Sequence, residues 1–183
     1  TGRALTRKGA QVGDLLCVGG ELGDAAGALP LVLGQRQGEP AVALALLARY
    51  WSPMPLLDLG LALRGKATAA LDISDGLLAD CGHIAAASGV ALLIEQAQVP
   101  ISAALRAFAG ETVARQCALS GGDDYRLAFT LPAAYLADLQ QAGWPVRVIG
   151  RAVAGQGVTL LDSQGQPVQL PRSGYQHFGS ASD

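Results

Sequence analysis

The chain has 183 residues, 50% of them hydrophobic, and a formal net charge of −2 at pH 7. This length and composition allow one sizeable hydrophobic core and predict a single globular unit. The chain has no basic cluster that would indicate a nucleic-acid partner, and its apolar runs are shorter than the roughly 18 residues that cross a membrane.

Predicted strands and helices alternate along the chain. In chain order they are a strand at 14–20, helices at 25–34, 39–51 and 56–63, a strand at 67–73, a helix at 76–88, a strand at 90–95, one or two helices within 101–118, a strand at 124–130, a helix at 132–143, and strands at 146–153 and 157–162. We expect Asp24 to cap the first helix, Pro30 to shorten or kink it, and Gly89 to end the helix at 76–88. The alternation predicts an α/β fold.

The two ends of the chain differ in character from its middle. Residues 1–13 form a basic connector that starts without methionine, so we expect the chain to begin partway through a larger protein. A single domain is expected at 14–178, followed by a frayed polar tail at 179–183.

Cys17, Cys81 and Cys117 are widely separated and lie in apolar settings. We interpret them as reduced core thiols of a cytoplasmic protein, because free cysteine is commonly buried. With only His83 and His177 beside them, they are too scattered to form a zinc site.

The stretch L-D-I-S-D-G-L at 71–77 places Asp72 and Asp75 on either side of Ser74, where a predicted strand meets a predicted helix. Such crossings bind ligands in α/β folds, and a helix that starts near Gly76 offers free backbone N–H groups to an anion. Carboxylate oxygens hold Mg²⁺, and a serine hydroxyl can donate to a phosphate oxygen. An ordinary helix start, with Ser74 or Asp75 as N-cap and Asp72 as an exposed strand end, fits the same spacing. Both interpretations are open.

A second acidic cluster lies in S-G-G-D-D-Y-R at 120–126. Gly121 and Gly122 allow a turn in which the backbone approaches another group closely, and Asp123 and Asp124 then begin the next strand. Two acidic clusters at strand ends are compatible with one shared site. The alternative is an ordinary glycine turn with solvated carboxylates.

Four motifs occur together in one order: G-R-A-L-T-R-K-G-A-Q-V-G-D at 2–14, G-E-L-G-D-A-A-G-A-L at 20–29, L-D-I-S-D-G-L at 71–77 and S-G-G-D-D-Y-R-L-A-F-T at 120–130. Over nearly the whole chain they resemble the C-terminal half of the thiamine-monophosphate kinase family. That family belongs to the superfamily of aminoimidazole ribonucleotide synthetase and selenophosphate synthetase. The resemblance implies the C-terminal domain of that superfamily's fold, an α/β (α+β) domain with a mixed sheet and packed helices.

The resemblance also implies a reaction, the ATP-dependent phosphorylation of thiamine monophosphate to thiamine diphosphate. Mg²⁺ ions would lie between the nucleotide and acidic residues, and no covalent intermediate or general base is expected. The implied site residues are Asp72 and Asp75 for the metal, Arg7 and Ser74 for ATP, and Asp123 with Phe178 or Tyr175 for the thiamine substrate.

The chain departs from the family pattern in one motif and in its extent. G-G-E-D-Y-E reads G-G-D-D-Y-R here, so Asp123 is one methylene shorter than glutamate and Arg126 replaces an acid. The family's N-terminal domain, which forms a homodimer and carries further metal and nucleotide residues, is expected upstream. The isolated chain is therefore expected to be inactive.

Two other functions are compatible with the sequence. The chain could belong to another ATP-dependent member of the superfamily that acts on a different phosphorylated or carboxylated small molecule. It could also be a non-catalytic binding or assembly module whose acidic turns are only caps and solvated surface.

Overall fold

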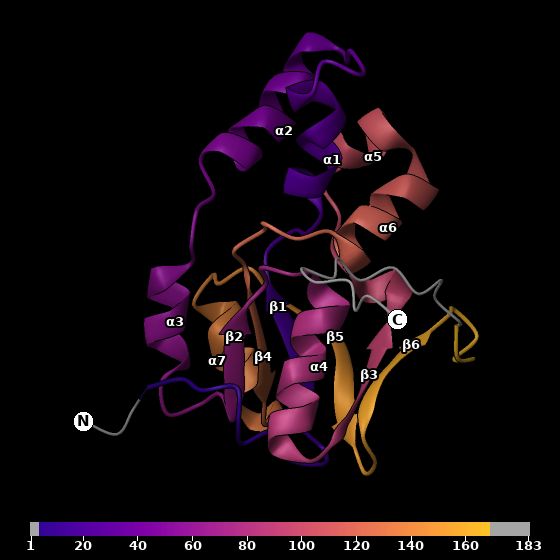
Figure 1. Cartoon of the computed structure of the whole chain (residues 1–183). Helices are drawn as coiled ribbons and strands as arrows, with labels where there is room; N and C mark the ends of the chain where they lie inside the picture. Colours follow the sequence, from indigo (N-terminus) through magenta and orange to yellow (C-terminus); the bar gives the residue numbers. More distant parts are fainter. Residues whose placement is uncertain (1–3, 169–183) are drawn as a thin grey trace, which may run out of the picture.

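The computed structural model describes residues 4–168, which form one sheet with helices packed around it (Figure 1). The strands are β1 (Leu15–Gly19), β2 (Ala69–Asp72), β3 (Ala91–Glu95), β4 (Leu127–Leu131), β5 (Val146–Val153) and β6 (Gly157–Leu161). The helices are α1 (Asp24–Val32), α2 (Pro40–Trp51), α3 (Leu57–Leu63), α4 (Leu77–Ser88), α5 (Ala103–Ala109), α6 (Glu111–Ser120) and α7 (Leu136–Gln141), with 3₁₀ turns η1 (Gln96–Gln98) and η2 (Ala133–Tyr135).

The sheet has six strands in the order β2-β4-β1-β5-β3-β6. The β3–β6 pair is parallel, and every other neighbouring pair is antiparallel. This mixed sheet with packed helices confirms the predicted fold class. The pairing of β2 with β4 sets Asp72 opposite Leu127, so the two predicted acidic motifs lie at the same end of neighbouring strands.

The two faces of the sheet pack against different helices. Helix α4 covers one face, and α3 and α7 cover the other (Figure 1). Successive residues of β1 alternate between these layers, as side chains on a strand must. Leu16 and Val18 share a core cluster with Ile84 of α4, whereas Cys17 packs in a second cluster with Leu63 of α3.

Helices α1, α2, α5 and α6 form a separate group beyond the end of the sheet that carries the acidic motifs (Figure 1). Their buried side chains, among them Ala28, Leu46, Leu105 and Ala118, continue the core cluster that lies beneath α4. The helical group therefore forms one wall beside the ends of β1 and β2.

The described elements follow the predicted order, with differences at two motifs. The prediction that Asp24 caps α1 is wrong, because Gly23, with φ of 91°, is the N-cap. Asp24 instead accepts a hydrogen bond of 2.5 Å from the Ser102 hydroxyl. Pro30 lies inside α1, which ends two residues later, and Gly89 ends α4 in a left-handed conformation as predicted. The strand predicted from 124 begins at Leu127, because the preceding residues form a loop.

All three cysteines are free, as predicted. Cys17 and Cys81 are fully buried and Cys117 is partly buried, and burial raises the pKa of the Cys17 and Cys81 thiols to about 12. These thiols are therefore core residues and are not poised as nucleophiles. Within residues 4–168, no helix combines the length and the apolar character needed to cross a membrane.

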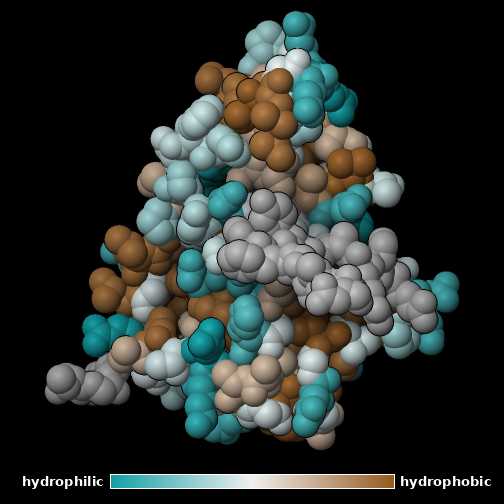
Figure 2. Space-filling view, in the orientation of Figure 1, coloured by the Kyte–Doolittle hydropathy of each residue, from teal (hydrophilic) through white to brown (hydrophobic). Residues whose placement is uncertain are grey.

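Exposed apolar side chains concentrate on helix α3 and on the group formed by α1, α2, α5 and α6. Figure 2 shows them at the position of α3 and on the helical group at the top of the view. They include Leu57 and Leu61 of α3, Leu33 after α1, and Trp51 of α2. These surfaces remain uncovered by the described part of the chain. The predicted tail at 179–183 lies outside the described residues.

Candidate active site

The loop between β2 and α4 carries the first acidic motif. Asp72 and Asp75 are exposed, and Ser74 is half-buried. The N-cap of α4 is Gly76, with φ of 111°, and no side chain caps the helix. The interpretation of Ser74 or Asp75 as the N-cap is therefore wrong, and their side chains are left available for other groups.

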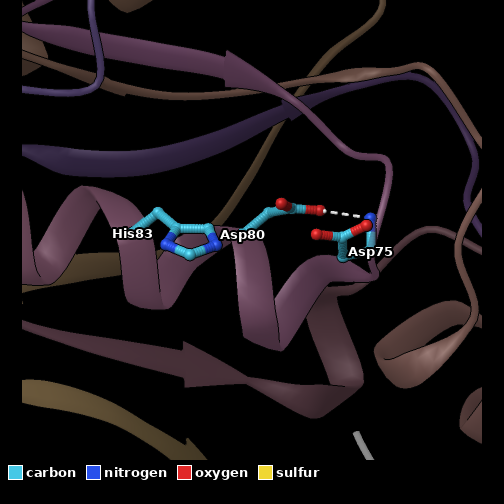
Figure 3. A group of neighbouring side chains, drawn as sticks. All are labelled: Asp75, Asp80 and His83. Carbon is cyan, nitrogen blue, oxygen red and sulfur yellow. Dashed lines mark hydrogen bonds between the residues drawn. The ribbon is translucent and has the colours of Figure 1, made fainter. Parts of the chain in front are cut away.

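Asp80, in the first turn of α4, fixes the shape of this loop. One of its carboxylate oxygens accepts hydrogen bonds from the backbone N–H groups of Ser74 and Asp75, both at 3.0 Å. Figure 3 shows this carboxylate turned toward the Asp75 backbone. Burial raises the pKa of Asp80, which is only 4% exposed, and the two backbone hydrogen bonds oppose the shift. Asp80 therefore orients the peptide that carries Asp75.

The second acidic motif packs directly against the first. The Asp123 N–H donates to the Ser74 carbonyl at 3.1 Å, and the Tyr125 N–H donates to the Ile73 carbonyl at 2.9 Å. A Cβ atom at Gly122 would lie 2.2 Å from the Ser74 carbonyl oxygen, so only glycine fits there. Gly122 thus makes the expected close approach to the first motif, whereas Gly121 approaches Ala26 and Cys117, and the two loops form one unit.

The second loop holds an unusual backbone. Asp123 and Tyr125 have φ values of 65° and 49°, which non-glycine residues rarely adopt and which cluster at functional sites. The Tyr125 hydroxyl donates to the Asp123 carboxylate at 3.2 Å. The charge of Asp123 raises the pKa of Tyr125, and that of Asp72 adds to the effect, so both carboxylates lie near this ring.

Asp124 anchors the second loop to the turn before α1. Both of its carboxylate oxygens accept from the Gly23 N–H, at 3.0 and 2.8 Å. Burial raises the pKa of Asp124 to about 7, although the hydrogen bond from Gly23 opposes the shift. Sequence patterns alone assign no role to Asp80 or Asp124. An acid in the first turn of a helix and the doubled aspartate of G-G-D-D were the only signals of them.

The arrangement can hold a divalent cation. Asp72, Asp75 and Asp123 are exposed around the joined loops, and within residues 4–168 none of them forms a salt bridge. Asp75, Asp80 and His83 also bring one ligand atom each within 4.8 Å of one another (Figure 3). Asp80 is already bonded to two amides, however, and Mg²⁺ prefers oxygen ligands to imidazole. Asp72 and Asp75 offer exposed carboxylate oxygens, the type of ligand that Mg²⁺ prefers.

Arg7 lies apart from the joined loops. It is exposed, and its carbonyl accepts from the Ser88 hydroxyl at 3.4 Å. Ser88 ends α4, whereas Ser74 and Asp75 precede it, and a 12-residue helix is roughly 18 Å long. A ligand that contacts both Arg7 and Ser74 would have to extend along this helix. Tyr175 and Phe178 lie outside the described residues.

Comparison with known protein families shows to which family the chain belongs. The profile of the family described as AIR synthase related protein, C-terminal domain, matches residues 11–163. The chain belongs to this family.

Individual relatives of this AIR synthase related domain are thiamine-monophosphate kinases. The Escherichia coli K12 enzyme is 40% identical over 98% of this chain and 57% of its own length. The crystal structure of the Stenotrophomonas maltophilia K279a enzyme superposes with a TM-score of 0.82 at 44% identity, covering 91% of this chain and 55% of its own. The structure of AaThiL complexed with AMPPCP and TMP gives a TM-score of 0.82 at 33% identity, covering 95% and 54%. The chain therefore spans about half the length of these relatives.

Proposed function

We propose that this chain supplies the C-terminal half of the active site of a thiamine-monophosphate kinase. The observation that carries the proposal is the joining of the two acidic loops, which leaves three exposed carboxylates at one end of the sheet. A relative that is 40% identical over 98% of this chain is named for this activity, and one related structure contains AMPPCP, an analogue of ATP, together with TMP.

In the proposed reaction, the γ-phosphoryl group of ATP moves to the phosphate of thiamine monophosphate. The bond between the γ-phosphorus and the β,γ-bridging oxygen breaks, and a bond forms from the γ-phosphorus to an oxygen of the acceptor phosphate. The products are ADP and thiamine diphosphate. Mg²⁺ would neutralise charge on the phosphates. Such a transfer depends on position and electrostatics, so the proposal assigns no covalent nucleophile and no general base.

Each site residue has a defined part in this proposal. Asp72 and Asp75 hold Mg²⁺, and Asp80 keeps the Asp75 peptide oriented through its two hydrogen bonds. Ser74 binds ATP, with the first turn of α4 directing backbone N–H groups toward anions. The family resemblance assigns Arg7 to the ATP phosphates, and because its backbone lies at the far end of α4, this contact requires a ligand that extends along the helix. Asp123 contacts thiamine, and Phe178 or Tyr175 packs on one of its rings.

The proposal includes parts of the protein that this chain does not contain. An N-terminal domain would complete the nucleotide and metal site, and the full-length protein would form a homodimer. The relatives are about twice as long as the matched region, which supports an additional domain. The isolated chain is accordingly proposed to be inactive, and the full-length protein to work in the cytoplasm.

The test is product formation by the full-length gene product. MgATP and thiamine monophosphate are supplied, and thiamine diphosphate is followed by mass spectrometry. We expect product from the parent and loss of product from Asp72→Asn. Asp138→Asn, which changes an exposed carboxylate on α7, is the matched control and should keep full activity.

Three outcomes would contradict the proposal, the first two in full and the third in the role of Asp72. Unchanged thiamine monophosphate in the parent reaction would favour a different substrate in the superfamily. Absence of any Mg²⁺-dependent nucleotide binding would favour the non-catalytic module. Equal activity of Asp72→Asn and the parent would remove the metal role of the first motif.

A further inference from the structure

A pocket of about 860 Å³ lies beside the joined loops and does not include Asp72, Ser74 or Asp75 in its lining. It is bounded by the residues that follow β1, the start of β5 and the segment after η1. Its charged lining residues are Arg49, Arg106, Arg126, Arg147 and Glu21. Four arginines and one glutamate give this pocket a positive charge, in a chain whose formal net charge is −2.

The four arginines come from different parts of the fold. Arg49 is in the last turn of α2, Arg106 is in α5, Arg126 directly precedes β4, and Arg147 is the second residue of β5. Arg106 pairs with Glu111, and Arg49 lies 3.9 Å from Asp24. Within residues 4–168, Arg126 and Arg147 form no salt bridge. The fold therefore gathers four like charges around one pocket, and Arg147 among them has no salt-bridge partner within the described residues.

Arg126 is the most informative of the four because it is only 8% exposed. Its guanidinium donates a hydrogen bond from Nη1 to the Met54 carbonyl at 3.0 Å. Every fully buried side-chain nitrogen or oxygen in the described part of the chain has a partner, so the remaining guanidinium nitrogens keep some contact with solvent. Burial lowers the pKa of Arg126 and the nearby charge of Arg49 lowers it further, whereas the charges of Asp124, Asp24 and Glu21 oppose the shift. Arg126 therefore lines the pocket with guanidinium donors from which a ligand's oxyanion can accept.

We propose that this pocket binds the oxyanion group, phosphate or carboxylate, of a small organic molecule. A guanidinium presents parallel N–H donors that match the geometry of both oxyanions. Leu56, Val99, Ile101 and Trp144 also line the pocket, and this apolar surface suits the organic part of such a ligand. The site goes beyond the proposed kinase function: its lining includes Arg126 of the 120–126 motif but none of the residues assigned above to Mg²⁺, ATP or thiamine.

The test measures anion binding by the full-length gene product without catalysis. Inorganic pyrophosphate and citrate are titrated calorimetrically in buffer that contains EDTA and no nucleotide, so that no metal bridges an anion to the acidic loops. We expect at least one probe to bind and its affinity to fall as KCl is raised, since salt screens the charges. Tighter binding of pyrophosphate would assign a phosphate ligand, and tighter binding of citrate a carboxylate ligand.

Matched variants locate the binding. Arg147→Gln and Arg126→Gln should each weaken binding about tenfold, as expected for loss of a charge-assisted contact. Arg151→Gln removes an arginine from the same strand as Arg147, where it pairs with Glu95 outside the pocket, and should leave the affinity unchanged. If Arg126→Gln does not fold, the affinity of Arg147→Gln alone tests whether the anion binds in this pocket.

Absence of binding by both probes overturns the proposal. Equal affinities of the parent and Arg147→Gln overturn it as well. Because no Mg²⁺ or ATP is present, failure of this site is separate from failure of the proposed kinase activity.

Discussion

Both acidic loops combine exposed carboxylates with one buried carboxylate, and the two kinds have different surroundings. Asp75 and Asp123 are exposed and form no salt bridge within residues 4–168. Asp80 and Asp124 are buried and accept hydrogen bonds from backbone N–H groups. The buried acids fix the loops, and the exposed acids remain free to meet a ligand. Aspartates close in sequence therefore have different parts: the buried ones stabilise the loops, and the exposed ones are available to bind a ligand.

The largest effect should come from separating the two loops. Gly122→Ala places a Cβ atom 2.2 Å from the Ser74 carbonyl oxygen, which is backbone and cannot move without shifting the first motif. We expect destabilisation of roughly 3 kcal/mol or more, at the upper end of single substitutions, measured by urea denaturation.

The control for this substitution is Gly82→Ala in the middle of α4, where a Cβ atom would meet nothing within 4 Å. It should stabilise the protein by about 0.5 to 1 kcal/mol, because alanine is the better helix former. Equal stabilities of the two variants would show that the loops are not in contact as described.

The second effect concerns the buried acid of the first loop. Asp80→Ala leaves the Ser74 and Asp75 N–H groups without their acceptor, and we expect a loss of roughly 2 to 4 kcal/mol in the free energy of unfolding. Asp80→Asn keeps an acceptor oxygen and should cost less. If Asp80→Ala unfolds at the same urea concentration as the parent, the loop does not depend on Asp80.

The difference between exposed and buried acids also explains which site residues could be predicted from the sequence. Apolar strand and helix patterns located the 71–77 motif at a strand-to-helix crossing, and this location was correct. Spacing carries no information on burial, so Asp80 was indistinguishable from an acid placed near a helix N-terminus for its charge. Asp124 depends on Gly23, which lies 101 residues away in sequence. The arginine pocket likewise combines Arg49, Arg126 and Arg147 from separate elements, and no local pattern links them.

The third effect is a pH dependence that arises from Asp124. Burial raises its pKa from 3.8 to about 7, so between these values the folded protein binds more protons than the unfolded chain. The stability that this group contributes is fully present below its unfolded pKa and is lost as pH rises through about 7. The loss should reach at most about 1.4 kcal/mol per pH unit.

Urea denaturation at several pH values between about 4 and 7 measures this slope. Asp124→Asn keeps an acceptor for the Gly23 N–H but does not titrate, so its stability should change less with pH than that of the parent. Asp138→Asn, on the exposed surface of α7, should follow the parent curve. Parallel curves for Asp124→Asn and the parent would contradict the raised pKa.

The smallest effect on stability should come from the exposed acid of the first loop. The charge of Asp75 raises the pKa of Asp80, so removing it by Asp75→Asn relieves a repulsion. We expect the free energy of unfolding to change by no more than about 0.5 kcal/mol, in the stabilising direction.

Added MgCl₂ should raise the melting temperature of the parent, because a ligand that binds only the folded state stabilises it, and should raise that of Asp75→Asn less. An equal Mg²⁺ response in both proteins would assign the metal elsewhere, and strong destabilisation would show that Asp75, like Asp80, serves the fold.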